Sequence, residues 1–456
     1  MQKNSIEIRC NKLIFPIYSI VGICVGIVFS VLQRCPLAAL RRSAVRWKNS
    51  KVVSNVVGLT LFNAIGGFLV LVTNVKLANS LGASLFGLYS YYLAVGEVGA
   101  NFVRYGRHKS MIRDLIQFPN NNSSLISNTL CLGIINTFIF LLVVAVFSSP
   151  LDVPLNLTVI LLVVSPCLIS LDFQPVYEAM KLMSWHSVYY LVQKIMFLAG
   201  IWGFYVVTYR MNLSVVAIVL FLSWIFILIV QYREIIVQLK IRLTEYISFR
   251  NIRTLYRSNF LIALSCMAGV AFGPYIRLIL NNYVSSSAVG IYSAGFQLFL
   301  MSQFIIHQIS RVGNPMMAEA GRQGCSVETR NGFVKKYVRI MILGTLPFFI
   351  PLFFFPKFVT SSFFSEEYAE LYRYLPYFAI YLLALSIGIV YTQFLISMRK
   401  DRVYFLIYIS GALLTIISGY LLIPICGVLG GVLSLCLSHS VACIGYYIAA
   451  KQIMKK

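Results

Sequence analysis

The sequence predicts an all-α polytopic membrane protein with twelve core transmembrane helices, arranged as two six-helix pseudo-symmetric lobes. Composition, the spacing of apolar stretches and an internal repeat support this fold class. Of the 456 residues, 59% are hydrophobic and 11% are charged, and no CxxC motif occurs. Because soluble domains carry about 25% charged residues, the composition excludes a soluble globular domain. It also excludes a disordered chain and a disulfide scaffold.

Twelve stretches after residue 51 are long enough to cross a bilayer as helices, which takes about 20 mainly apolar residues. They lie at 53–76, 85–104, 125–148, 155–176, 187–208, 213–232, 258–280, 287–310, 338–356, 374–397, 403–422 and 427–449. The connections between them are short, so we expect no extramembrane domain.

The positions of the basic residues predict the orientation. The net charge is +24, and most of the 38 Lys and Arg residues lie in connections after even-numbered spans or at the ends of the core. The opposite connections hold only Lys76, Arg210, Lys357 and Arg373. The positive-inside rule therefore puts both ends of the twelve-helix core in the cytoplasm. Anionic membrane lipids are the expected partners of the basic loops.

Residues 1–50 are expected to form an N-terminal extension with one apolar segment at 13–33, which is long enough to be an extra hydrophobic helix. Two alternatives stay open. A secretory signal fits the length, although Arg34 and Cys35 spoil a cleavage site, and an over-extended start of the reading frame also fits.

An internal repeat divides the core. LGASLFGLYS at 81–90 is similar to VSSSAVGIYS at 284–293, at an offset of 203 positions. Six spans return a chain to its starting side, so a duplicated unit gives parallel repeats related by an axis along the membrane normal. We expect an N-lobe at 51–254 and a C-lobe at 255–456, with a substrate path between them. The alternative is a purely local role for G-x-Y-S, as a helix-start turn with an interfacial tyrosine.

The first hairpin, from Asn55 to Arg113, resembles the opening of bacterial polysaccharide flippases that move O-antigen and similar lipid-linked oligosaccharides. The family pattern, L-A-x-x-L-G, F-G-x-Y, a glycine and a downstream arginine, corresponds here to Leu77, Ala78, Leu81, Gly82, Phe86, Gly87, Tyr89, Gly99 and Arg107. The family's arginine before L-G is missing, and Asn79 and Ser80 stand there.

Two later motifs extend the resemblance over about 52–456. Asn314, Pro315 and Met316 resemble the family's proline after the eighth helix, and PICGVLGG from Pro424 to Gly431 resembles its P-x-x-G-x-x-G-A turn. These flippases belong to the multidrug/oligosaccharidyl-lipid/polysaccharide (MOP) exporter superfamily. The resemblance implies a two-lobed, MATE-like helical bundle with alternating access to a central cavity, in the bacterial cytoplasmic (inner) membrane.

Polar residues inside spans are costly and usually face a cavity or a partner. In the span at 85–104 and just beyond it, one helical face carries Glu97, Asn101, Arg104 and His108. We interpret this stripe as cavity-lining, with its bases binding an anionic substrate and Glu97 as the candidate for ion coupling. The alternative is a Glu–Arg arrangement within one helix that ends in a cytoplasmic cap.

The repeat predicts a second stripe. Adding 203 to Arg104 and His108 gives His307 and Arg311, and Gln303 extends that face by one turn. Two basic pairs across a pseudo-two-fold axis would suit a pyrophosphate, since guanidinium groups bind phosphate bidentately. Snorkelling toward lipid headgroups is the alternative.

Four more polar positions are candidates for substrate binding. Asn63 and Asn74 share a face of the first span, where amides serve either helix packing or sugar hydroxyls. Lys194 and Arg277 are the most isolated charges in the spans. Asp172 and Glu178 are expected to pair with Lys181 or Lys194.

The leading hypothesis is a flippase that translocates an undecaprenyl-pyrophosphate-linked oligosaccharide from the cytoplasmic to the outer leaflet. The cargo would be an O-antigen or a related surface polysaccharide unit, as in lipopolysaccharide. No catalytic residue, cofactor or nucleic acid is expected, and a polysaccharide polymerase and a chain-length regulator are candidate partners.

The four histidines show no metal-ligand spacing, and no P-loop occurs. The alternatives are a membrane polymerase or glycosyltransferase, and a drug or metabolite exporter of the same superfamily.

Overall fold

The computed structural model describes residues 50–117, 122–147, 156–180, 182–208, 210–239, 247–320, 327–398 and 400–454. These residues are almost entirely helical and include no strand, which confirms the all-α prediction. The apolar segment at 13–33 and the rest of the N-terminal extension before Ser50 lie outside the described residues.

The helices overlap with all twelve predicted spans. In chain order they are α3 (Ser50–Arg104), α4 (Arg107–Gln117), α5 (Asn122–Phe147), α6 (Leu157–Ile169), α7 (Gln174–Ala179), α8 (Met183–Thr208), α9 (Leu213–Leu239), α10 (Phe249–Ala268), η2 (Gly269–Phe272), α11 (Pro274–Tyr283), α12 (Ser286–Ala320), α13 (Val327–Phe354), α14 (Pro356–Phe363), η3 (Glu366–Arg373), α15 (Leu375–Ser397), α16 (Asp401–Cys426) and α17 (Val428–Met454).

Within the described ranges, nine helices are long and apolar enough to cross a membrane, or ten if the bent pair Phe249–Phe260 and Ile262–Phe272 forms one span. The chain is therefore a multi-pass membrane protein.

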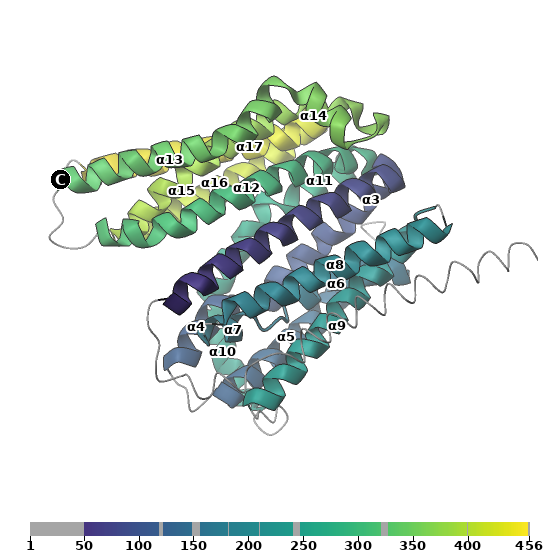
Figure 1. Cartoon of the computed structure of the whole chain (residues 1–456), viewed down its shortest axis with the longest axis horizontal. Helices are drawn as coiled ribbons and strands as arrows, with labels where there is room; N and C mark the ends of the chain where they lie inside the picture. The colour runs from purple at the N-terminus through teal and green to yellow at the C-terminus, as the bar shows by residue number, and fades with distance from the viewer. Residues whose placement is uncertain are drawn as a thin grey trace, which may run out of the picture.

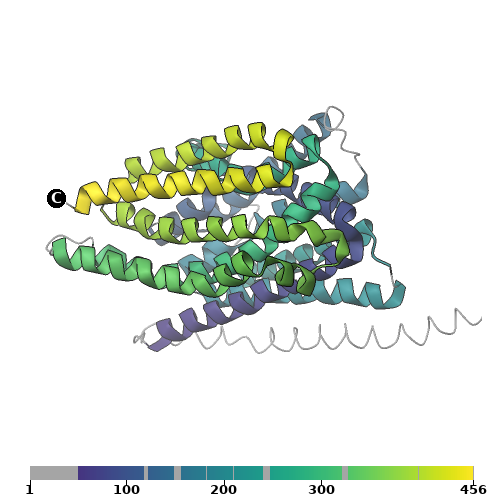
Figure 2. The same ribbon diagram turned by 90° about the horizontal axis from the view of Figure 1, so that it is seen from above.

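The helices form two groups that meet along α3 and α12 (Figure 1). On one side α15 packs against α13, α16 and α17, and on the other side α6 and α8 both pack against α9. Figure 2 shows that α3 begins and α17 ends at the same end of the bundle. The end of α12 and the start of α13 also lie there, and we call it the basic end. The opposite, far end holds α14 and η3 (Figure 1).

The structure corrects several predicted boundaries. The expected loop between 76 and 85 is helical except at Gly82, whose φ of 73° breaks α3 into two legs and favours glycine. The expected span at 155–176 matches one candidate span, Leu157–Ala179, which contains two helices, α6 and α7, with Pro175 in the first turn of α7. Likewise, the expected span at 258–280 consists of α10, η2 and α11.

The two helix groups touch most closely where α3 crosses α12. A Cβ atom on Gly87 would lie 1.7 Å from the carbonyl oxygen of Ser286, and one on Gly290 would lie 2.0 Å from that of Ala83. The two contacts are equivalent under the sequence repeat, since adding 203 converts Ala83 into Ser286 and Gly87 into Gly290. Small residues let helices approach closely in lipid, where burial from water does not drive association.

We therefore expect Gly87→Ala to destabilise the protein by about 3 kcal/mol, because the new methyl group cannot avoid a backbone oxygen. Gly203→Ala is the matched control. A Cβ atom there meets nothing within 4 Å, so helix propensity alone should make it neutral or slightly stabilising. Thermal unfolding of the purified proteins in detergent measures both, and equal unfolding temperatures would contradict the importance of the crossing.

Candidate functional site

A cavity of about 490 Å³ lies between the two helix groups in their basic half. Asn63 and Gly67 of α3, Gln174 and Glu178 of α7, residues of α8 and Phe304 of α12 line it. We call it the polar compartment. A neighbouring space of about 270 Å³ shares Gly67, Tyr190 and Phe304 but is otherwise lined mainly by apolar side chains of α3 and α12, and we call it the apolar compartment.

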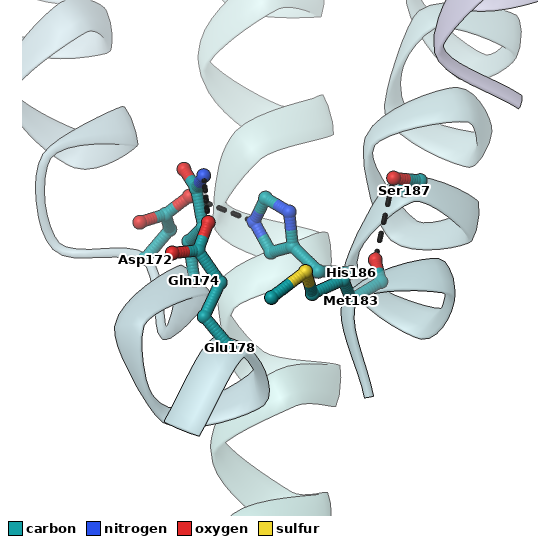
Figure 3. A network of polar contacts seen from close by, with 6 residues as sticks. All are labelled: Asp172, Gln174, Glu178, Met183, His186 and Ser187. Carbon is teal, nitrogen blue, oxygen red and sulfur yellow. Dashed lines mark hydrogen bonds and ion pairs between the residues drawn. The ribbon is translucent and has the colours of Figure 1, made fainter. Parts of the chain in front are cut away.

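Paired polar side chains build one wall of the polar compartment (Figure 3). The Gln174 amide donates to the Glu178 carboxylate at 2.7 Å along α7. His186 of α8 faces this helix and contacts the Asp172 carboxylate at 2.9 Å. Ser187 donates to the Met183 carbonyl at 3.3 Å. The break before Pro175 is what turns Asp172, Gln174 and Glu178 toward α8.

Deeper contacts fix this wall in place. Tyr177 of α7 donates to the Glu234 carboxylate of α9 at 2.6 Å, and Tyr189 of α8 donates to the same group. Gln193 donates to Ser223 of α9 at 2.9 Å. Three helices thus share one polar framework, so the side chains that face the cavity rest on a rigid support.

Gly67 and the rings of Tyr190 and Phe304 line both compartments, and Gly66 packs next to the Tyr190 ring. A Cβ atom on Gly66 would lie 3.4 Å from the Tyr190 ring, and one on Gly67 would lie 3.8 Å from the Phe304 ring. Tyr190 belongs to α8 and Phe304 to α12, so rings from both helix groups flank the same stretch of α3. A larger residue at Gly67 would fill this space.

An ion pair joins the groups further along α3. Arg277 of α11 pairs with Glu97 and donates to the Ser90 carbonyl at 3.4 Å. The Arg277 side chain is 8% exposed and that of Glu97 is 41% exposed. The sequence predicts Arg277 as one of the most isolated charges and Glu97 as part of a cavity-lining stripe, whereas the fold pairs the two side chains with each other.

The remaining sequence-predicted residues are dispersed. Asn63 lines the polar compartment, whereas Asn74 is buried and Asn101 donates to the Glu97 carbonyl at 2.9 Å. Lys194 lies over the rings of Tyr190 and Trp224, at 4.6 and 5.2 Å from their centroids. Asp172 contacts His186 and Glu178 accepts from Gln174, and the other predicted partner, Lys181, lies outside the described residues.

The two predicted basic pairs are not brought together by any described contact. Arg104 and His307 are exposed and Gln303 is half-buried. The side chains of His108 and Arg311, in α4 and α12, lie outside what the structure describes, so the pairs stay a prediction.

Sequence reasoning missed Gln174, His186, Ser187 and Tyr190 as cavity residues. The available signal was the run of polar residues around Pro175, at the inner end of an apolar stretch. Tyr190 carries no such signal, because tyrosines are common throughout this chain.

Arg107, which belongs to the family motif, is held inside the fold by hydrogen bonds to backbone carbonyls. Its guanidinium is buried and donates to the carbonyls of Thr129 and, at 3.2 Å, Ser170. It lies in α4, outside the candidate spans, and burial lowers its pKa to about 10, so it stays charged at neutral pH.

Near the far end, hydrogen bonds join α3 to the segment from α14 to η3, and we call this set of contacts the latch. The Asn79 amide donates to the Phe363 carbonyl at 2.9 Å and accepts from the Ser365 amide at 2.9 Å. The Glu367 carboxylate accepts from the Ala83 amide at 2.7 Å, which caps the second leg of α3 where it restarts after Gly82. Tyr368 donates to the Ala78 carbonyl at 3.1 Å.

Solved structures of similar fold are membrane transporters. The lipid II flippase MurJ, in an inward closed conformation, matches with a TM-score of 0.68 at 12% identity, covering 86% of this chain and 87% of that one. A mutant of the MATE transporter VcmN from Vibrio cholerae matches with a TM-score of 0.60 at 13% identity, covering 89% and 98%. An inward-facing multidrug resistance MATE family transporter of the MOP superfamily has a TM-score of 0.60 at 13% identity, covering 87% and 94%.

The fold is thus that of MOP superfamily transporters, as the resemblance implied. Residues 52–321 match the family model described as polysaccharide biosynthesis protein. The chain belongs to this family. No curated protein sequence matches it.

The ion pair yields a prediction on stability. We expect Glu97→Gln to cost about 3 kcal/mol, because it leaves the buried Arg277 without its counter-charge. The double variant Glu97→Gln/Arg277→Gln should recover most of that loss, since it removes the uncompensated charge. Unfolding of the single and double variants in detergent tests this, and simple additivity of the two single changes would refute the pairing.

Proposed function

We propose that the protein is a flippase that moves an undecaprenyl-pyrophosphate-linked oligosaccharide across the bacterial cytoplasmic membrane by alternating access. The observation that carries this proposal is the cavity between the two helix groups, which is bounded on the far side by the α3–α12 crossing and the latch. Membership of the polysaccharide biosynthesis family and a fold shared with a lipid II flippase support a lipid-linked glycan as cargo.

The orientation follows from the charges. With the basic end in the cytoplasm, the cavity would face the leaflet in which the cargo would be made. Transport would require the crossing and the latch, which join the helix groups near the far end, to open while the basic end closes. The two lobes, 51–254 and 255–456, would rock against each other.

No covalent chemistry is required of the protein. The polar compartment would hold the sugars, and the apolar compartment offers space for the first part of the lipid chain. The two basic pairs predicted from the sequence would contact the pyrophosphate. An O-antigen unit is the proposed cargo, and a polymerase and a chain-length regulator are the proposed partners.

Glu97 is the candidate for ion coupling, because a cation or proton on its carboxylate would weaken the pair with Arg277 between the helix groups. Transport by Glu97→Gln with an unaltered dependence on cations would count against that role.

One observation favours a second candidate function. The described residues that line the two compartments include Glu178 but no Lys or Arg, a polarity that suits a cationic cargo. Export of cationic drugs or metabolites is therefore the alternative, and resistance to such compounds on overexpression would support it.

The enzymatic alternative is less well supported. A glycosyltransferase would need catalytic groups in the longest far-end connection, which here forms α14 and η3. Glu367 caps α3 and Glu370 lies 3.7 Å from Arg373, so these carboxylates have structural partners.

Deletion of the gene should leave complete lipid-linked repeat units in the cytoplasmic leaflet, because nothing would carry them across. Accessibility of the glycan to a membrane-impermeant lectin in spheroplasts, compared with inverted vesicles, measures this. Units that reach the outer surface but stay unpolymerised would indicate a polymerase instead.

Alternating access predicts that a bond across the crossing stops transport. The hydroxyl oxygens of Ser84 and Ser286 lie 3.2 Å apart, so Ser84→Cys/Ser286→Cys should form a disulfide under mild oxidation. We expect oxidation to abolish transport and reduction to restore it, with Ser84→Cys alone as the control. Undiminished transport by the cross-linked protein, verified by mass spectrometry, would refute opening at this crossing.

A further inference from the structure

We propose that a groove formed by α13, α15 and α17 binds the phosphate headgroup of an anionic phospholipid from the cytoplasmic leaflet. Basic loops attract anionic lipids in general, whereas this proposal assigns one particular site. The site lies outside the cavity between the helix groups and does not depend on which cargo the protein moves.

The groove has a volume of about 420 Å³ and lies at the basic end. Its lining comes from the first turns of α13, from Tyr391 of α15 and from the last turns of α17. Figure 2 shows α15 running between α13 and α17, and Figure 1 shows α13 and α17 on the side of α12 that is turned away from α6, α8 and α9. We call it the outer groove, because the two compartments of the cavity are lined by other helices.

Three basic side chains line the outer groove. Lys335 and Arg339 are one turn apart on α13, and Lys451 lies on α17. All three are exposed, and none of them forms an ion pair with a carboxylate in the described part of the chain. Because ammonium groups bind phosphate as point charges and guanidinium groups bind it bidentately, these side chains suit a phosphate held from two sides.

The carboxylate of Glu328 is the only one on α13, and it shares a helical face with Lys335. Glu328 comes seven residues before Lys335, which is about 10 Å along a helix. That distance is about one Debye length at 0.1 M salt, and Glu328 is exposed. It therefore offsets little of the positive charge in the outer groove.

Two further acidic residues, Glu319 and Asp401, lie near this end of the chain's helices, and their side chains are outside what the structure describes. Asp401 stands between Lys400 and Arg402 in the sequence, and Arg322 follows Glu319 by three residues. The connections beside the outer groove therefore contain more positive than negative charge.

Aromatic and apolar side chains complete the outer groove. The rings of Tyr391 and Tyr447 meet edge to face with 5.4 Å between their centroids, and the Lys451 ammonium lies 5.7 Å from the centroid of the Tyr447 ring. Val334 and Val338 line the α13 side. Tyrosines and lysines gather where hydrocarbon meets the headgroups, so the outer groove offers charges for a phosphate beside an apolar surface for the first acyl carbons.

The hydropathy of the sequence sets the depth of the outer groove. The expected spans at 338–356 and 427–449 have their cytoplasmic limits within it. Lys335 and Lys451 lie just outside these spans, and Val338 and Tyr447 lie just inside them. Basic pockets between membrane helices on the cytoplasmic side bind lipid headgroups. A free phosphate ion would leave the apolar part of the outer groove uncovered, so the geometry favours a lipid.

Binding of tritiated phosphatidylglycerol to the purified full-length protein in detergent tests the proposal, by scintillation proximity. Phosphatidylcholine, which has no net charge, is the comparison lipid. We expect Lys335→Ala/Lys451→Ala to weaken the tightest phosphatidylglycerol binding by about tenfold, because two of the three cations are lost. Binding of phosphatidylcholine should be unchanged.

Lys336→Ala/Lys400→Ala is the matched control. It removes the same charge from the same end of the protein, at two exposed positions that do not line the outer groove, so phosphatidylglycerol should bind as it does to the unaltered protein. All four lysines are exposed, and equal unfolding temperatures without added lipid would verify that both variants are folded. An excess of inorganic phosphate should fail to displace the lipid.

Equal losses of phosphatidylglycerol binding in the two double variants would indicate only general attraction to the basic end, and would overturn the proposal. Displacement of the lipid by inorganic phosphate would overturn it as well, because the groove would then be a site for a free ion. An equal loss of phosphatidylcholine in Lys335→Ala/Lys451→Ala would contradict recognition of the anionic headgroup.

Discussion

The close approach of α3 and α12 at Gly87 and Gly290 is the contact on which the rest of the structure depends. In lipid, apolar surface gains nothing by facing another helix, so association relies on close packing and on polar contacts. At this crossing, the carbonyl oxygens of Ser286 and Ala83 occupy the space that a Cβ atom on Gly87 or Gly290 would need. This crossing holds the far halves of the two helices together, and the cavity lies between the helix groups toward the basic end.

Polar contacts add to the glycine packing that joins α3 to the second half of the chain. The latch at Asn79 and Glu367 and the ion pair of Glu97 with Arg277 all join α3 to elements of the second half of the chain. Each one costs desolvation and is retained only while both partners are in place. In the proposed transport cycle these polar contacts would break and reform together with the packing at the crossing.

Much of the fold could be predicted from the sequence, because the hydropathy of each span is a local property. The internal repeat also aligned Gly87 with Gly290, the two glycines that lie at the crossing. The site was harder to predict from the sequence. Asn63 was found from its helical face, but the partner of Arg277 depends on how the two halves dock. The role of Tyr190 depends on the glycines opposite it, and neither relationship is encoded in local sequence spacing.

The cap on the second leg of α3 has a consequence for biogenesis. The Ala83 amide, near the start of the core, is bonded by Glu367, which lies 284 positions further along the chain. Membrane proteins are inserted as they are translated, so the first hairpin enters the bilayer long before its capping carboxylate has left the ribosome. Until then, water must accept the hydrogen bond of the Ala83 amide. The break at Gly82 therefore has to stay at the aqueous surface while the intervening helices are inserted.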